Sequence, residues 1–105
     1  MKTAIATAAV IGLAACAPAQ AQEESKKDKI CKNMYETADQ VMKARQAGAP
    51  LPETISVFEE KMYREMVRIA YREPRFNTQA YKQRSIDRYA NQWASSCYEN
   101  LEVGK

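Results

Sequence analysis

Apolar side chains recur at steps of three and four residues in three stretches of the chain, which polar or proline-containing segments separate. This spacing places them on one face of a helix, so it predicts three amphipathic helical regions, at about residues 29–47, 52–73 and 77–103. The apolar stripes consist of Ile30, Cys31, Met34, Tyr35, Ala38, Val41 and Met42 in the first region, Ile55, Phe58, Met62, Met66, Ile69 and Ala70 in the second, and Tyr81, Ile86, Tyr89, Ala90, Trp93, Cys97 and Leu101 in the third.

Glycine, proline and polar residues mark the predicted ends of these regions. Gly48 favours the left-handed conformation that ends a helix. Pro52 suits the first turn of the next helix, because the backbone N–H that proline lacks would have no hydrogen-bond partner there. Pro74 ends the second region, and Asn77 or Thr78 can cap the third. No strand pattern occurs along the sequence, so we predict an all-α domain.

The first 21 residues have the pattern of a bacterial secretory signal peptide. Lys2 supplies a charged start, and an uncharged apolar run over residues 5–15 follows. That run is shorter than the about 20 apolar residues that span a bilayer. Small residues at Ala19 and Ala21 fit a signal-peptidase site. We therefore expect cleavage after Ala21, with an N-terminal membrane anchor or a buried helix as the alternative.

A second signal overlaps the first. Residues 13–16, with the sequence Leu-Ala-Ala-Cys, resemble a bacterial lipobox, in which Cys16 becomes the lipidated first residue of the mature chain. The uncharged Ala17 is typical of lipoproteins sent to the outer membrane. The polar segment 22–29 is then a leader or a tether. Both alternatives place the domain in the periplasm, either free or lipid-anchored to the outer membrane.

Either signal removes Cys16 from the free thiols and leaves Cys31 and Cys97. In an oxidising compartment, two cysteines in one small domain are expected to form a disulfide. The chain-entropy model gives a loop of this length about 4 kcal/mol of stabilisation. The alternative is a reactive thiol pair, which no Cys-x-x-Cys spacing favours.

The disulfide constrains the number of helices. Three antiparallel helices would put Cys31 and Cys97 at opposite ends of a bundle about 25 Å long, whereas a disulfide needs Cα atoms within about 7 Å. We therefore predict that the second region breaks into two helices near residues 59–61, or crosses the bundle steeply. The predicted fold is a small all-α bundle of three to four helices over residues 30–103, closed by the Cys31–Cys97 disulfide.

The remaining composition favours binding over catalysis. The chain has no histidine, so a Ser/His or Cys/His catalytic arrangement is excluded. Glu60 and Glu65 lie at helical spacing from Arg64 and Arg68, which predicts surface ion pairs, and no metal-ligand spacing occurs. The net charge of +3 is small for a nucleic-acid-binding domain. We expect no enzyme activity, metal, cofactor or specific nucleic-acid partner, and membrane contact only through a lipid anchor.

Arginines recur at four-residue steps along the second and third regions. Their rigid guanidinium groups bind phosphates and carboxylates in a two-pronged geometry. The arginines therefore form either a binding face for an anionic partner or, as the interleaved glutamates favour, an ordinary solvated face. Exposed aromatic residues beside the stripes would instead mark a protein-binding surface. The residues concerned are Arg64, Arg68, Arg72, Arg75, Arg84 and Arg88, and the aromatic residues Tyr63, Tyr71, Phe76 and Tyr98.

Three features together resemble a family of small exported proteins encoded by phages and prophages. They are M-x-x-R-Q-x-G at residues 42–48, A-Y-x-x-P-R-F at residues 70–76, and the late Cys97. The chain departs from the family in the two prolines of its first linker, Pro50 and Pro52, and in its lipobox. The resemblance covers residues 31–98. Its shared-surface candidates are Arg45, Gln46, Tyr71, Pro74, Arg75 and Phe76, for which helix-end packing and turn chemistry are the alternative interpretation.

Some members of that family resemble superinfection-exclusion proteins, which act in the periplasm and stop a second phage from delivering its DNA. The resemblance therefore implies a binding role, with a protein of the envelope or of the incoming phage as partner. Two alternatives remain. An inhibitor of a periplasmic or cell-wall enzyme would use the linker at residues 49–52 as its inserting loop, and a structural envelope lipoprotein would depend on Cys16.

Overall fold

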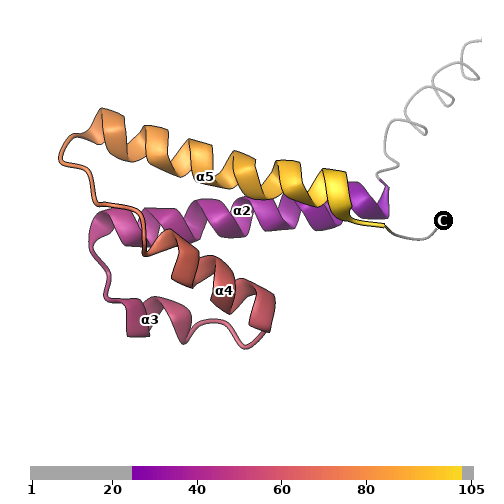
Figure 1. Cartoon of the computed structure of the whole chain (residues 1–105), viewed down its shortest axis with the longest axis horizontal. Helices are drawn as coiled ribbons and strands as arrows, with labels where there is room; N and C mark the ends of the chain where they lie inside the picture. Colours follow the sequence, from indigo (N-terminus) through magenta and orange to yellow (C-terminus); the bar gives the residue numbers. More distant parts are fainter. Residues whose placement is uncertain (1–24, 103–105) are drawn as a thin grey trace, which may run out of the picture.

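The computed structural model describes residues 25–102, and within this range it is a bundle of four helices without a strand (Figure 1). The predicted all-α bundle is confirmed. The two long helices run antiparallel and pack along each other, while the two short helices lie on one side of α2. The predictions for residues 1–24, which include the signal peptide and Cys16, lie outside the described residues. The helices are α2 (Lys26–Ala47), α3 (Leu51–Ile55), α4 (Lys61–Ala70) and α5 (Gln79–Asn100).

Helix α2 begins three residues before the predicted start, because Ser25 caps it. The Ser25 side chain accepts a hydrogen bond from the amide of Asp28 at 3.0 Å. Residues 26–29 of the expected polar leader are therefore helical. At the other end Gly48 adopts a φ of 89°, and its amide and that of Ala49 return to carbonyls of the last turn, as predicted for a glycine that ends a helix.

The second region breaks into α3 and α4 at residues 56–60, next to the predicted position. Arg64 stabilises this break, because its Nη1 donates to the carbonyls of Ile55 at 3.1 Å and Phe58 at 2.8 Å. These carbonyls lie at and beyond the end of α3, where a helix leaves its own acceptors unpaired. Arg64 therefore bonds the loop backbone, and not Glu60 as its spacing predicted.

Because of the break, α3 and α4 together return the chain to the end of α2, and α5 can then run back along the whole of α2 (Figure 1). Helix α3 leads away from the corner at Gly48, and α4 returns toward it (Figure 1). Helix α5 then starts at the cap of Thr78, whose hydroxyl accepts the amide of Tyr81 at 3.2 Å, and runs back beside α2. Cys31 and Cys97 consequently lie 5.5 Å apart between their Cα atoms and form the predicted disulfide.

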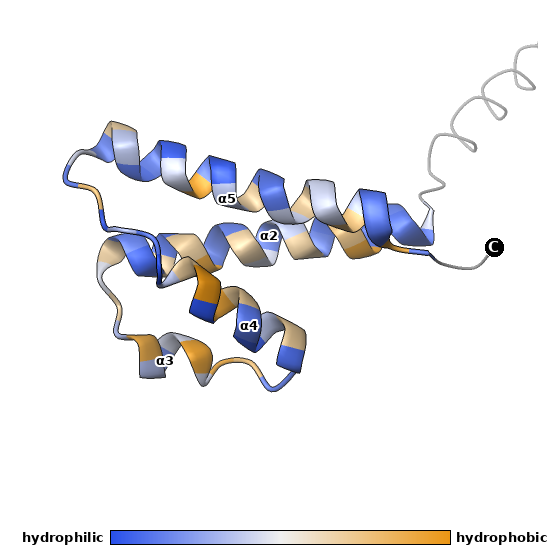
Figure 2. Ribbon diagram, in the orientation of Figure 1, coloured by the Kyte–Doolittle hydropathy of each residue, from blue (hydrophilic) through white to orange (hydrophobic). Residues whose placement is uncertain are grey.

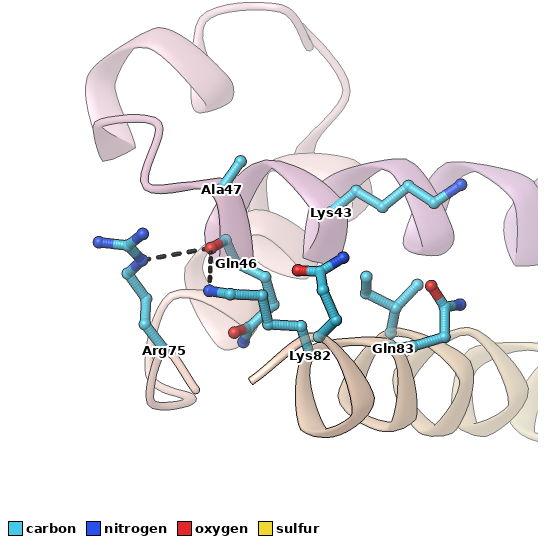
Figure 3. A pocket seen from close by; sticks show the side chains of 8 residues that line it. Lys43, Gln46, Ala47, Arg75, Lys82 and Gln83 are labelled. Atoms are coloured by element: carbon cyan, nitrogen blue, oxygen red, sulfur yellow. Dashed lines mark hydrogen bonds between the residues drawn. The ribbon is translucent and has the colours of Figure 1, made fainter. Parts of the chain in front are cut away.

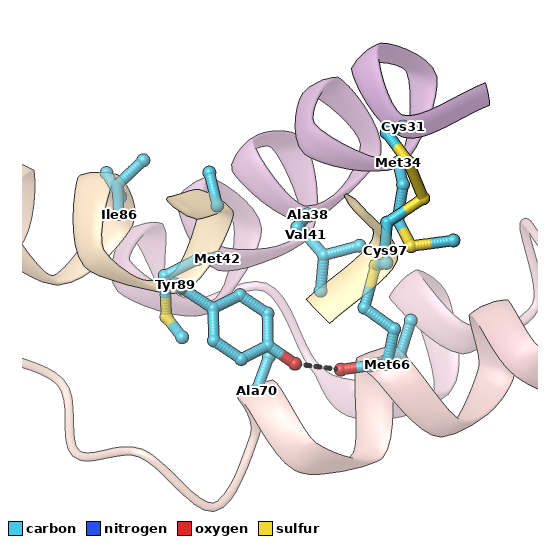
Figure 4. Packing of buried hydrophobic residues seen from close by; sticks show 12 residues of the cluster. Cys31, Met34, Ala38, Val41, Met42, Met66, Ala70, Ile86, Tyr89 and Cys97 are labelled. Carbon is cyan, nitrogen blue, oxygen red and sulfur yellow. Dashed lines mark hydrogen bonds between the residues drawn. A yellow bond between two sulfur atoms is a disulfide. The ribbon is translucent and has the colours of Figure 1, made fainter. Parts of the chain in front are cut away.

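The core lies between α2, α5 and one face of α4 (Figures 2 and 4). Three predicted core residues are exposed, Ile30, Met62 and Tyr81, and Val67 is buried although it was not predicted. The rest of the stripe predicted for α4 is confirmed, because Met66 and Ala70 are buried and Ile69 packs against the core. The buried apolar residues are Cys31, Met34, Ala38, Val41, Met42, Met66, Val67, Ala70, Ile86, Tyr89, Ala90 and Cys97.

Tyr89 joins α5 to α4 through this core. Its hydroxyl donates to the carbonyl of Met66 at 2.6 Å (Figure 4), and burial raises the pKa of Tyr89 to about 12. Because the folded-state pKa lies above the ordinary value near 10, the folded state resists ionisation of the phenol. This resistance contributes about 2–3 kcal/mol to the free energy of unfolding. The contribution is complete below pH 10 and is lost as the pH rises toward 12.

Replacing Tyr89 with phenylalanine is therefore expected to have opposite effects at neutral and high pH. At pH 7 the variant should be about 1 kcal/mol less stable, because it lacks the hydrogen bond to Met66. Its stability should fall less steeply above pH 10, so that the variant becomes the more stable protein. Urea unfolding of both proteins from pH 7 to 11.5 measures this crossing, and a constant difference between them contradicts it.

Candidate functional site

The two sequence motifs meet at the corner where α2 ends and α5 begins. Gln46 is 2% exposed, and its side-chain amide donates to the carbonyl of Pro74 at 2.9 Å. Its Oε1 accepts the backbone amide of Phe76 at 2.8 Å. A buried amide that is bonded through both its donor and its acceptor satisfies the backbone groups of an otherwise irregular turn. Gln46 therefore fixes residues 74–76 against the end of α2.

Arg45 and Tyr71 fix the other half of the same turn. The Nε of Arg45 donates to the carbonyl of Glu73 at 2.9 Å, and its guanidinium carbon lies 5.2 Å from the centre of the Tyr71 ring. The Tyr71 hydroxyl donates to the carbonyl of Ala49 at 2.7 Å. Its single proton is then used, so the Thr54 hydroxyl, 2.7 Å away, donates to it. These contacts connect the linker before α3, and α3 itself, to the end of α4.

Arg75 approaches the end of α2 where Gly48 leaves space for it. A Cβ atom on residue 48 would lie 3.0–3.2 Å from three atoms of the Arg75 guanidinium. The Nε of Arg75 donates to the carbonyl of Gln46 at 3.3 Å, and the Nζ of Lys82 donates to the same oxygen at 2.9 Å (Figure 3). Two cations from different segments thus neutralise one carbonyl at the negative end of α2.

A hollow of about 390 Å³, here called the corner hollow, lies beside these two cations (Figure 3). Lys43 adds a third basic group, but its Nζ forms an ion pair with Asp39 at 2.9 Å, and the hydrogen bond raises the pKa of Lys43. The polar residues that line the corner hollow are Lys43, Gln46, Arg75, Gln79, Lys82 and Gln83.

The six motif residues predicted as a shared surface are brought to this one corner, but most of their polar groups contact the protein itself. Gln46 is buried, and Arg45, Tyr71 and Phe76 are half-buried. Pro74 and Arg75 are exposed at the rim of the corner. Helix-end packing and turn chemistry, the alternative interpretation, describe the observed contacts of Gln46, Arg45 and Tyr71.

The remaining arginines do not form one continuous face. Arg68 pairs with Glu65 as predicted, and Arg88 contacts Glu73 at 3.4 Å. The guanidinium carbon of Arg84 lies 5.1 Å from the centre of the Tyr81 ring. Arg64 bonds the loop between α3 and α4, and the exposed Arg72 lies beyond the end of α4 at Ala70, so Arg68 is the one arginine of the predicted row that remains exposed on α4. The contacts match the solvated-face interpretation with interleaved glutamates.

A second hollow, of about 290 Å³ and here called the α3 hollow, lies between α2 and α3. Its prominent feature is Val57, which is 70% exposed directly after α3. Val57 was not among the predicted site residues, although it stands between Ile55 and Phe58 and one helix face cannot bury all three. The lining residues are Gln40, Val41, Ala44, Ala49, Glu53, Thr54, Val57 and Phe58.

Lys82 in the corner hollow was not among the predicted site residues either. Its side chain contacts a residue 36 positions earlier, and no local pattern reveals such a contact. The position of Lys82 is itself unusual, because it lies near the start of α5. The positive end of the helix dipole is there, and a cation near it is unfavourable. A lysine in such a place needs a compensating acceptor, which the Gln46 carbonyl supplies.

Within residues 25–102, no three His, Cys, Asp or Glu residues lie close enough together to hold a metal ion. Among the four helices of this range, none combines the length and the hydropathy that a membrane-spanning segment requires. Comparison of the chain with protein-family models, with curated proteins and with solved structures finds no match.

Proposed function

We propose that this chain is an exported, prophage-encoded binding protein that excludes superinfecting phage by blocking DNA delivery at the envelope. Its place of action is the periplasm, either free or lipid-anchored through Cys16. The Cys31–Cys97 disulfide supports an extracytoplasmic location, because such bonds persist in oxidising compartments. The two motifs and the late cysteine support the assignment to exported phage proteins.

The observation that carries the proposal is the exposed apolar surface at the α3 hollow. Val57 is 70% exposed beside a hollow whose apolar lining includes Val41, Ala44 and Phe58. An apolar residue held this far out of the core contributes little to folding but can bury its surface against a partner. Gln40 and Glu53 give the hollow a polar rim, as in protein–protein interfaces. The partner is a protein of the envelope or of the incoming phage.

The motif residues and the α3 segment have different structural roles, and this difference supports the α3 hollow as the contact surface. Residues shared with the exported phage proteins, such as Arg45 and Gln46, hold the turn before α5 in place. The segment that departs from that pattern, with Pro50 and Pro52, forms the start of α3. The shared motifs thus maintain the scaffold, and the divergent α3 segment supplies the contact that selects the partner.

An enzyme inhibitor would need the linker at residues 49–52 to protrude as a rigid loop. The Ala49 carbonyl instead accepts the Tyr71 hydroxyl, and Leu51 and Pro52 already belong to α3. The linker is therefore held against the end of α4. This contact favours exclusion through the α3 hollow over inhibition through the linker.

Expression of the wild-type protein in a susceptible host should lower phage plating while adsorption stays normal and DNA delivery stops. The Val57→Asp variant should restore plating at least tenfold, because it places a charge where about 1.5–3 kcal/mol of apolar contact is expected. Adsorption is measured by depletion of free phage, and DNA delivery by expression of a phage-borne reporter.

The matched control is Ser95→Asp, which adds the same charge at an exposed position of α5. Both variants should unfold within about 0.5 kcal/mol of the wild type, because both sites are exposed. Unchanged plating with the wild-type protein overturns the proposed function. Equal exclusion by wild type and Val57→Asp leaves exclusion standing and removes the α3 hollow as its contact surface.

A further inference from the structure

The corner hollow differs from the rest of the surface in the balance of its charges. Arg75 and Lys82 both donate to the Gln46 carbonyl, at 3.3 and 2.9 Å, so one oxygen atom holds their head groups next to each other. Within residues 25–102 neither side chain forms an ion pair with a carboxylate. Figure 3 shows Arg75 reaching the end of α2 from the loop before α5, and Lys82 reaching it from the first turn of α5.

Nearby groups do not cancel these two charges. The negative end of α2 and the positive end of α5 meet at this corner, and each amounts to about half an elementary charge, so their effects oppose each other. Asp39 is bonded to Lys43, and the Asp87 carboxylate accepts the side-chain amide of Gln83 at 2.9 Å. Neither carboxylate is bonded to Arg75 or Lys82, and the three cations that line the corner hollow outnumber these two carboxylates, so a surplus of positive charge remains there.

Hydrogen-bond donors also remain for a ligand. The Arg75 guanidinium has five N–H groups and the Lys82 ammonium has three, and the Gln46 carbonyl takes one from each. The volume of about 390 Å³ lies within the range of small-molecule sites. Adjacent arginine and lysine donors around a small hollow suit an oxyanion with several acceptor oxygens, and a phosphate group is the common biological example.

We propose that Arg75 and Lys82 bind a phosphate group in the corner hollow, with the amide side chains of Gln79 and Gln83 as further donors. The phosphate belongs either to a free small molecule or to the head group of an anionic lipid. This site is separate from the α3 hollow and does not depend on the proposed exclusion function.

The test titrates the purified exported protein with sodium pyrophosphate and follows backbone amide shifts by NMR. A second arm measures co-sedimentation with vesicles of phosphatidylglycerol, compared with vesicles of phosphatidylcholine. The variant Lys82→Gln should weaken binding at least fivefold, and Arg75→Gln should do the same. The control Lys32→Gln removes an exposed lysine of α2 near the disulfide, and should bind like the wild type.

A site for a free phosphate compound is supported if Lys82→Gln loses pyrophosphate binding and Lys32→Gln keeps it. The same pattern with phosphatidylglycerol vesicles supports a lipid head group. Binding of neither probe, or equal loss in Lys82→Gln and Lys32→Gln, overturns the proposal. Thermal unfolding of each variant separates loss of the site from loss of the fold, and Arg75→Gln provides a second measurement where Lys82→Gln is destabilised.

Discussion

The double variant Cys31→Ser/Cys97→Ser is expected to lose about 4 kcal/mol of its free energy of unfolding. The disulfide closes a loop of 66 positions, so its removal restores a large amount of conformational entropy to the unfolded chain. A core of this size supplies only about 3–5 kcal/mol without such a crosslink. The variant should therefore be marginally folded at room temperature.

Urea unfolding followed by circular dichroism measures this loss. Replacing both cysteines avoids a free thiol that would form mixed disulfides. Wild-type protein treated with a reductant is the control, because it should show the same shift in midpoint without any change of sequence. If the double variant unfolds at the same urea concentration as the oxidised wild type, the disulfide contributes nothing to stability.

Replacing Gln46 with alanine should lower the free energy of unfolding by about 2–4 kcal/mol. The substitution removes the acceptor of the Phe76 amide and the donor to the Pro74 carbonyl, and it leaves a small cavity at the end of α2. Each backbone group left without a partner away from water costs about 1–3 kcal/mol. The turn that starts α5 should loosen first.

The control for this measurement is Gln40→Ala, which makes the same change at an exposed position of the same helix. Its unfolding free energy should stay within about 0.5 kcal/mol of the wild type. Hydrogen exchange at the amide of Phe76 provides a local readout, since Gln46 accepts from that amide. Equal stability and equal exchange in the two variants would show that Gln46 does not hold the turn.

Local signals in the sequence were sufficient for the two long helices. The stripe of α2 and the caps at Gly48 and Thr78 each depend on residues within one or two turns, so they can be predicted from sequence alone. The true start of α2 was predictable by the same logic, because Ser25 is followed three residues later by an acidic residue, Asp28.

The break between α3 and α4 has no local signal, and the prediction depended on the two cysteines. Arg64 stabilises the break by bonding carbonyls six and nine residues earlier, a contact that exists only after the loop has formed. Helical spacing to Glu60 predicted a different partner for the same side chain. Helical spacing therefore predicted the wrong partner for Arg64, whose guanidinium donates to backbone carbonyls of the loop.

The residues of the corner were predicted as a shared surface, but the contacts among them were not predicted. Gln46 lies four residues after Met42, on the apolar stripe of α2, and a polar residue on a buried stripe indicates a partner in the interior. That signal was available and would have favoured packing over surface exposure. The meeting of Arg75 and Lys82 at one carbonyl depends on how α5 packs on α2, so sequence spacing does not reveal it.

The position of the disulfide also determines how the domain responds to tension. Cys31 and Cys97 lie close to the two ends of the described chain, so a force that pulls on those ends passes through the covalent bond. The segment between them carries no load while the bond is intact, and about 220–240 Å of extended chain stays locked. The α3 hollow and the corner hollow lie within this shielded segment, so we expect both to keep their shape when the ends are stretched.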